Sequence, residues 1–138
     1  MPRLKHLGTL LMPNQATDLL LPAHCALSCL TNGAFQDTHR QDLAVLANVA
    51  QVMAEDEGEK ARPVLLAGMA LNRTLLALMR RHGDMGRWGA TGPELTALRS
   101  ALTTLDAYLR RQTTLRIKAA VRRVDALMDA MTEYPLSA

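Results

Sequence analysis

Apolar residues recur every three or four positions along most of this chain, which is the spacing of amphipathic helices. The clearest helix is predicted from about Ala61 to His82, with Gly83 as its C-cap. Its apolar sector is wide enough to predict a central helix with neighbours on several sides. That sector contains Leu65, Leu66, Met69, Leu71, Leu75, Leu76, Leu78 and Met79.

Two helices are predicted before it. One covers about Pro22 to Leu30, with a start at Thr17 left open because Pro22 would interrupt it. The next begins near Thr38, since Thr38 and Gln41 have the spacing of a capping box.

The last third of the chain predicts either one very long helix or two. Thr91 and Glu94 have capping-box spacing. Five leucines then follow at steps of three and four, a spacing typical of a coiled-coil seam that could join two copies of the chain. They are Leu95, Leu98, Leu102, Leu105 and Leu109. A continuous helix over residues 92–131 would be roughly 60 Å long. The apolar phase slips after the seam, which favours a break near Thr113-Thr114.

Composition supports an all-α fold. Leucine and alanine fill 46 positions, whereas valine and isoleucine fill only seven, and strands favour the β-branched residues that are scarce here. We therefore predict a bundle of four to five helices with a long or kinked C-terminal helix. Residues 1–138 are expected to form a single domain with an extended lead-in over residues 1–13.

Charge is unevenly placed along the chain. Residues 1–61 carry four Lys and Arg against seven Asp and Glu, whereas residues 62–138 carry twelve against six. This asymmetry fits an acidic or nucleic-acid partner for the second half, and it fits equally well two halves that face each other.

The segment from Arg110 to Arg123 contains six cations and no acid. On one continuous helix, Arg111, Lys118 and Arg122 would share a line, and Arg116 and Arg123 would share another. These residues predict either a helix that contacts nucleic-acid phosphates or a solvated polar face. No aromatic residue is interleaved for base stacking, which favours the solvated face.

The loop over residues 83–92 is the most distinctive element, with four of the eight glycines and the only tryptophan, Trp88. One interpretation is architectural: Trp88 covers the ends of the adjoining helices, and its N–H bonds to a loop carbonyl. The other is an exposed protein-binding pair, Arg87 and Trp88, of the types enriched at binding hot spots. A lone tryptophan in an aromatic-poor chain favours the first.

No catalytic or metal-binding motif is apparent. The chain has no P-loop, nucleophile elbow, zinc-protease or dinucleotide motif, so we expect neither an enzyme nor a cofactor. Cys25 and Cys29, beside His24, lack a second ligand pair for zinc, and we expect them on a buried helix face. Two cysteines form no disulfide framework, which favours a reducing cytoplasm. The longest apolar stretch, residues 63–71, is too short to span a membrane.

The segment RRHGDMGRWGATGPELTAL resembles one found in small uncharacterised helical proteins of proteobacterial phages, plasmids and integrated elements. Weaker similarity extends upstream through the segment LTNGAF and the helix after it, so that the resemblance covers about a third of the chain in all. It implies a mobile-element accessory protein and supplies no activity. The matching residues are Arg81, His82, Gly86, Arg87, Trp88, Gly89, Ala90, Thr91, Gly92, Glu94 and Leu95.

Two functions are therefore open. The first is a non-catalytic protein that acts by binding another protein, as an inhibitor of a host or defence component in the manner of anti-CRISPR proteins. The second is a nucleic-acid-binding transcriptional regulator that uses the basic segment.

Overall fold

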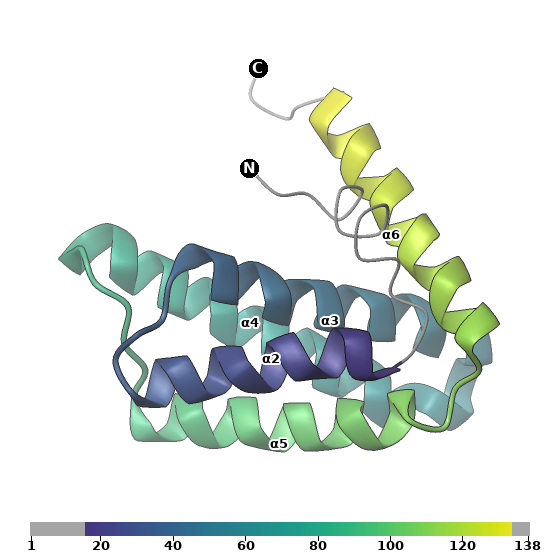
Figure 1. Cartoon of the computed structure of the whole chain (residues 1–138), viewed down its shortest axis with the longest axis horizontal. Coiled ribbons are helices and arrows are strands. Elements are labelled where there is room, and N and C mark those ends of the chain that lie inside the picture. The colour runs from purple at the N-terminus through teal and green to yellow at the C-terminus, as the bar shows by residue number, and fades with distance from the viewer. Residues whose placement is uncertain (1–15, 134–138) are drawn as a thin grey trace.

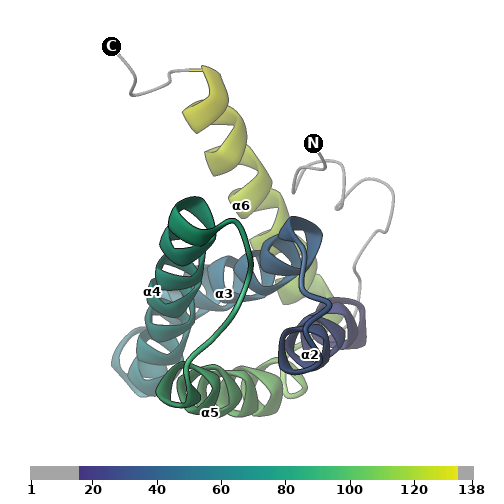
Figure 2. The same ribbon diagram turned by 90° about the vertical axis from the view of Figure 1, so that its left-hand side faces the viewer.

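The computed structural model describes residues 16–133, and all of its regular elements in this range are helices, which confirms the all-α prediction. Helices α2 to α5 run side by side as a bundle, and α6 leans away from it (Figures 1 and 2). The predicted lead-in over residues 1–13 lies outside the described range. The elements are α2 (Ala16–Thr31), α3 (Asp37–Glu57), the 3-10 turn η1 (Gly58–Ala61), α4 (Arg62–Met85), α5 (Gly92–Leu109) and α6 (Thr114–Glu133).

Helix α3 supplies the centre of the core, because it packs against α2, α4 and α6. Its buried side chains are small or aliphatic: Leu43, Val45, Leu46, Ala47, Val49, Ala50, Val52, Met53 and Ala54. Helix α4 crosses α3 closely at Gly68. A Cβ atom there would lie 2.6 Å from Gln51 Cγ and 3.1 Å from the carbonyl oxygen of Ala47. Glycine at this position therefore allows the two helices to approach.

Several predicted helix ends differ from the structure. Helix α2 passes through Pro22 without ending. Helix α3 starts one residue before Thr38, and the backbone N–H of Gln36 donates to His39 Nδ1 at 2.8 Å, so the predicted Thr38–Gln41 capping box is wrong. Helix α4 continues past Gly83.

The true C-cap of α4 is Gly86, whose φ of 74° is left-handed. Its N–H donates to the carbonyl oxygen of His82 at 2.8 Å. Glycine adopts this conformation without the steric cost that a Cβ atom would add.

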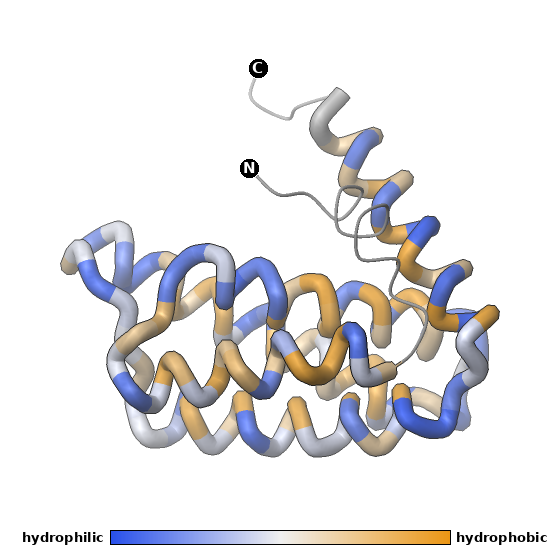
Figure 3. The backbone as a smooth tube through the Cα atoms, in the orientation of Figure 1, coloured by the Kyte–Doolittle hydropathy of each residue, from blue (hydrophilic) through white to orange (hydrophobic). Residues whose placement is uncertain are grey.

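The predicted break in the C-terminal third is confirmed. Helix α5 ends at Leu109 and α6 begins at Thr114. The apolar stripe of α6 is buried at Ile117, Ala120, Val121 and Val124. It continues in exposed methionines, Met128 and Met131, because α6 leans away from the bundle at that end (Figures 1 and 3).

The predicted dimer seam on α5 lies inside the chain instead. Leu98, Leu102, Leu105 and Leu109 are buried, and Leu95 packs half-buried against the same core. Helix α5 contacts α4 and α2. A homodimer through these leucines is therefore wrong, because the apolar surface that it needs is already used within one copy.

Among residues 16–133, no helix is both long enough and apolar enough to cross a membrane.

Candidate functional site

Trp88 joins three elements at one end of the bundle. Its ring stacks on His82 of α4, with centroids 4.3 Å apart, and makes a T-shaped contact with Phe35, with centroids 5.2 Å apart. Phe35 is buried in the connection between α2 and α3, and Trp88 itself is half-buried against the core. The Trp88 side chain thus covers the end of the bundle, as the architectural interpretation predicts.

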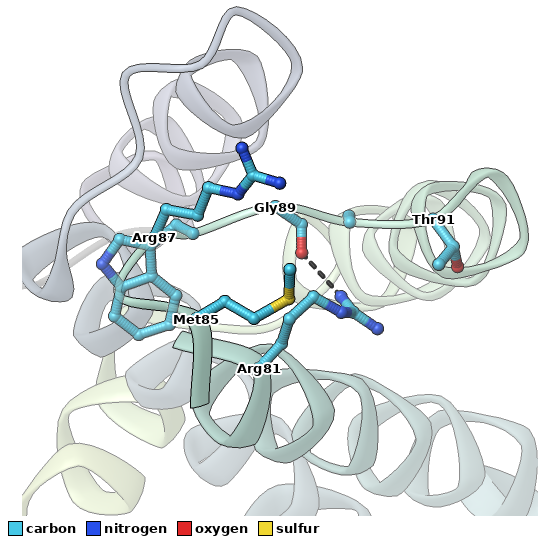
Figure 4. A pocket seen from close by; sticks show the side chains of 7 residues that line it. Arg81, Met85, Arg87, Gly89 and Thr91 are labelled. Atoms are coloured by element: carbon cyan, nitrogen blue, oxygen red, sulfur yellow. Dashed lines mark hydrogen bonds between the residues drawn. The ribbon is translucent and has the colours of Figure 1, made fainter. Parts of the chain in front are cut away.

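The hydrogen bond predicted for the indole N–H is not formed within residues 16–133, and Arg81 bonds the loop carbonyl instead. Arg81 Nη1 donates to the carbonyl oxygen of Gly89 at 2.6 Å (Figure 4). The same guanidinium donates two further bonds of 2.8 Å to the two carboxylate oxygens of Glu94. This bidentate contact ties the end of α4 to the start of α5.

Glu94 also closes the predicted capping box, which is confirmed. It accepts the backbone N–H of Thr91 at 2.9 Å, and its own N–H donates to Thr91 Oγ1 at 3.2 Å. Hydrogen bonds from the Arg81 guanidinium, aided by the Thr91 N–H, lower the pKa of Glu94 to about 2. The carboxylate is therefore ionised whenever the pair is intact.

An open pocket of about 340 Å³ lies between the last turn of α4 and this loop (Figure 4). Arg81, Met85, Arg87 and Trp88 line it together with residues 89–91. No histidine, cysteine or carboxylate is among these lining residues, so the pocket offers charge, an aromatic ring and the Thr91 hydroxyl but no side chain suited to act as a general base. Arg87 is exposed, whereas Trp88 is only half so.

Two of the predicted phosphate-binding arginines are engaged by acids at the end of α3. Arg116 donates to Glu57 Oε1 at 2.8 Å. Arg123 donates to both carboxylate oxygens of Asp56, at 2.9 and 2.8 Å. The acidic and basic halves of the chain thus face each other at this contact, which was one of the two alternatives for the uneven charge.

The line through Arg111, Lys118 and Arg122 is wrong, because residues 110–113 are not helical and Arg111 leaves the register of α6. Arg111 and Arg122 are exposed and Lys118 is half-buried. In the part of the chain that the structure describes, these three cations make no ion pair.

The cysteines do not lie on a buried face: Cys25 is exposed and Cys29 is half-buried, both as free thiols. His24 Nε2 lies 2.7 Å from Asp106 Oδ2 on α5. Between residues 16 and 133, no group of three or more His, Cys, Asp or Glu side chains could hold a metal ion.

The outer face of α4 is a candidate site that was not predicted from the sequence. Helix α4 packs against α3 and α5, but no other helix of the described range covers its outer side (Figure 2). Leu66, Met69, Leu76 and Met79 are 48%, 43%, 44% and 41% exposed. The prediction of neighbours on several sides is therefore wrong for this side. Arg73 and Arg80 follow the same line as Leu66, Met69 and Leu76, at steps of three and four. Two arginines on this line are the sequence signal that could have indicated an exposed face.

No family model matches the chain, and neither a curated protein nor a solved structure matches it.

We predict that Trp88→Ala lowers the free energy of unfolding by about 2 kcal/mol, less than for a fully buried tryptophan, because the ring is half-buried against His82 and Phe35. Arg87→Ala, on the exposed neighbour, should change it by less than about 0.5 kcal/mol. Urea denaturation followed by circular dichroism measures both. Equal stability of the two variants would contradict the architectural role of Trp88.

A second prediction concerns acid. Because the pKa of Glu94 is lowered to about 2, its ion pair stabilises the fold fully above the ordinary carboxyl pKa near 4.5 and stops doing so as pH falls through about 2. Glu94→Gln should therefore be less stable than the parent at pH 6, and the difference should shrink between about pH 5 and pH 2. Urea titrations across this range measure it, with the exposed Glu59→Gln as the control. A difference that does not change with pH would refute the ion pair.

Proposed function

We propose that this chain is a non-catalytic protein-binding protein, and that its binding surface is the outer side of α4. This surface, called the α4 face below, consists of Leu66, Met69, Arg73, Leu76, Met79 and Arg80. The observation that carries the proposal is that four large apolar side chains on one helix are each more than two-fifths exposed. Aligned apolar side chains that the fold does not cover are typical of interaction sites.

The composition of the α4 face suits a protein partner. Methionine and arginine are enriched at protein interfaces, whereas lysine and carboxylates are depleted there. The flexible methionines Met69 and Met79 adapt to the shape of a partner. The arginine side chains of Arg73 and Arg80 add apolar stems as well as charge to the same surface.

The alternative, a nucleic-acid-binding regulator, has less support. Phosphate binding depends on cations that release counterions, and carboxylates beside them oppose it. Asp56 and Glu57 lie against Arg123 and Arg116. The cations left for this alternative are Arg111, Lys118 and Arg122, and they no longer share one helical line.

The loop over residues 83–92 contributes in two ways. Its contacts through Arg81 and Trp88 fix the end of α4 relative to α5 and so hold the α4 face in place. Its resemblance to mobile-element proteins favours a host or defence component as the partner, met in the cytoplasm and inhibited by binding. Arg87, exposed beyond the end of α4, is available to extend the contact.

We predict that Leu66→Gln combined with Leu76→Gln weakens partner binding at least tenfold, because it removes two of the four large apolar side chains of the α4 face. A photo-cross-linking residue at Met69 in the natural host would identify the partner by mass spectrometry. Calorimetry with the purified partner would then compare the parent, the double variant and Leu115→Gln. Leu115 is 77% exposed on α6, away from the α4 face, and makes a matched control.

Unchanged affinity in the double variant would refute the α4 face as the binding surface. Salt-dependent retention on duplex DNA, lost in the Arg111→Ala, Lys118→Ala and Arg122→Ala triple variant, would favour the alternative function instead.

A further inference from the structure

We infer that the α4 face docks an amphipathic α-helix of the partner that carries acidic residues beside its apolar ones. This inference rests on the proposed function and specifies the chemistry of its partner. The spacing of the surface residues argues for a helix, and their charge argues for acids.

The surface residues form a helical ridge rather than a groove or an edge. Positions 66, 69, 73, 76 and 80 follow one another at steps of three and four, over about 21 Å of helix at 1.5 Å per residue. Such ridges pack into the grooves between the side chains of a second helix. An extended peptide would gain little here, because the backbone groups of α4 already bond within the helix and offer no sheet edge.

The charge of the α4 face has one sign. Between Leu65 and Met79, Arg73 is the only ionisable residue, and Arg80 is the next one along the helix. Both are exposed, and neither makes an ion pair within residues 16–133. The nearest acids in the sequence lie beyond the ends of the stripe: Glu59, which is 3.6 Å from Arg62, and Asp84 near the helix end. The middle of the surface therefore complements carboxylates.

The same charges argue against a second copy of this chain as the occupant. Two α4 faces that pair in parallel place each arginine beside its own counterpart, and antiparallel pairing about the middle of the stripe brings the two Arg73 side chains together. No acid in the stripe offsets this repulsion, which disfavours the pairing. The partner is thus a different protein with the complementary sign.

Two synthetic helical peptides test the inference directly. Each contains three heptads with leucine at positions a and d. One carries glutamate at positions e and g, and the other carries lysine there. Fluorescence anisotropy at about 0.1 M salt measures the affinity of each for the full chain. We expect the acidic peptide to bind at least tenfold more tightly than the basic one.

Variants assign the preference to the α4 face. Arg73→Ala with Arg80→Ala should remove the preference for the acidic peptide, and Arg73→Lys with Arg80→Lys should retain most of it. Leu66→Gln with Leu76→Gln should weaken both peptides. Arg111→Ala with Arg122→Ala is the matched control, since it removes two exposed arginines elsewhere, and should leave the preference unchanged. Thermal melts followed by circular dichroism confirm that each variant is folded.

Three results would overturn the inference: equal affinity for the two peptides, no binding of either, or a preference that persists without Arg73 and Arg80. None of these affects the proposed function, which fails separately if the cross-linked partner binds Leu66→Gln with Leu76→Gln as tightly as the parent.

Discussion

Burial of α3 is the constraint on which the rest of the structure depends. This helix is packed by α2, α4 and α6, and most of its buried residues are alanines and valines. Small side chains let neighbouring helices approach closely, as α4 does where Gly68 meets Ala47 and Gln51. Because dispersion contacts depend steeply on distance, close approach partly replaces the large aromatic side chains that this chain lacks.

The helices that surround α3 are themselves only partly covered by neighbours. Helix α6 reaches the core through its first three turns, where Arg116 and Arg123 meet Glu57 and Asp56 at the end of α3. Burial and the Glu57 carboxylate raise the pKa of Tyr108 at the same junction. Two arginines that the sequence offered as candidates for nucleic-acid binding thus hold α6 against the end of α3.

Helix α4 has the opposite arrangement. It packs against α3 and α5, and the contacts of Arg81 with Gly89 and Glu94 fix one of its ends. Its outer side carries leucines and methionines that no described helix covers. An apolar surface on a rigid, capped helix is ordered before a partner arrives. Less conformational entropy is then lost on binding, which favours affinity. The functional proposal follows from this incomplete coverage rather than from any catalytic group.

The sequence by itself determined the features that depend on neighbours within a few residues. Helical spacing, the Thr91–Glu94 capping box, the all-α class and the break before Thr114 all follow from local propensity and phase. Tertiary structure decided which apolar stripe is buried. The leucines of α5 and the outer residues of α4 have the same kind of spacing, yet the first lie in the core and the second face solvent. Periodicity shows that a face is apolar, but only the packing of distant segments determines whether another helix covers it.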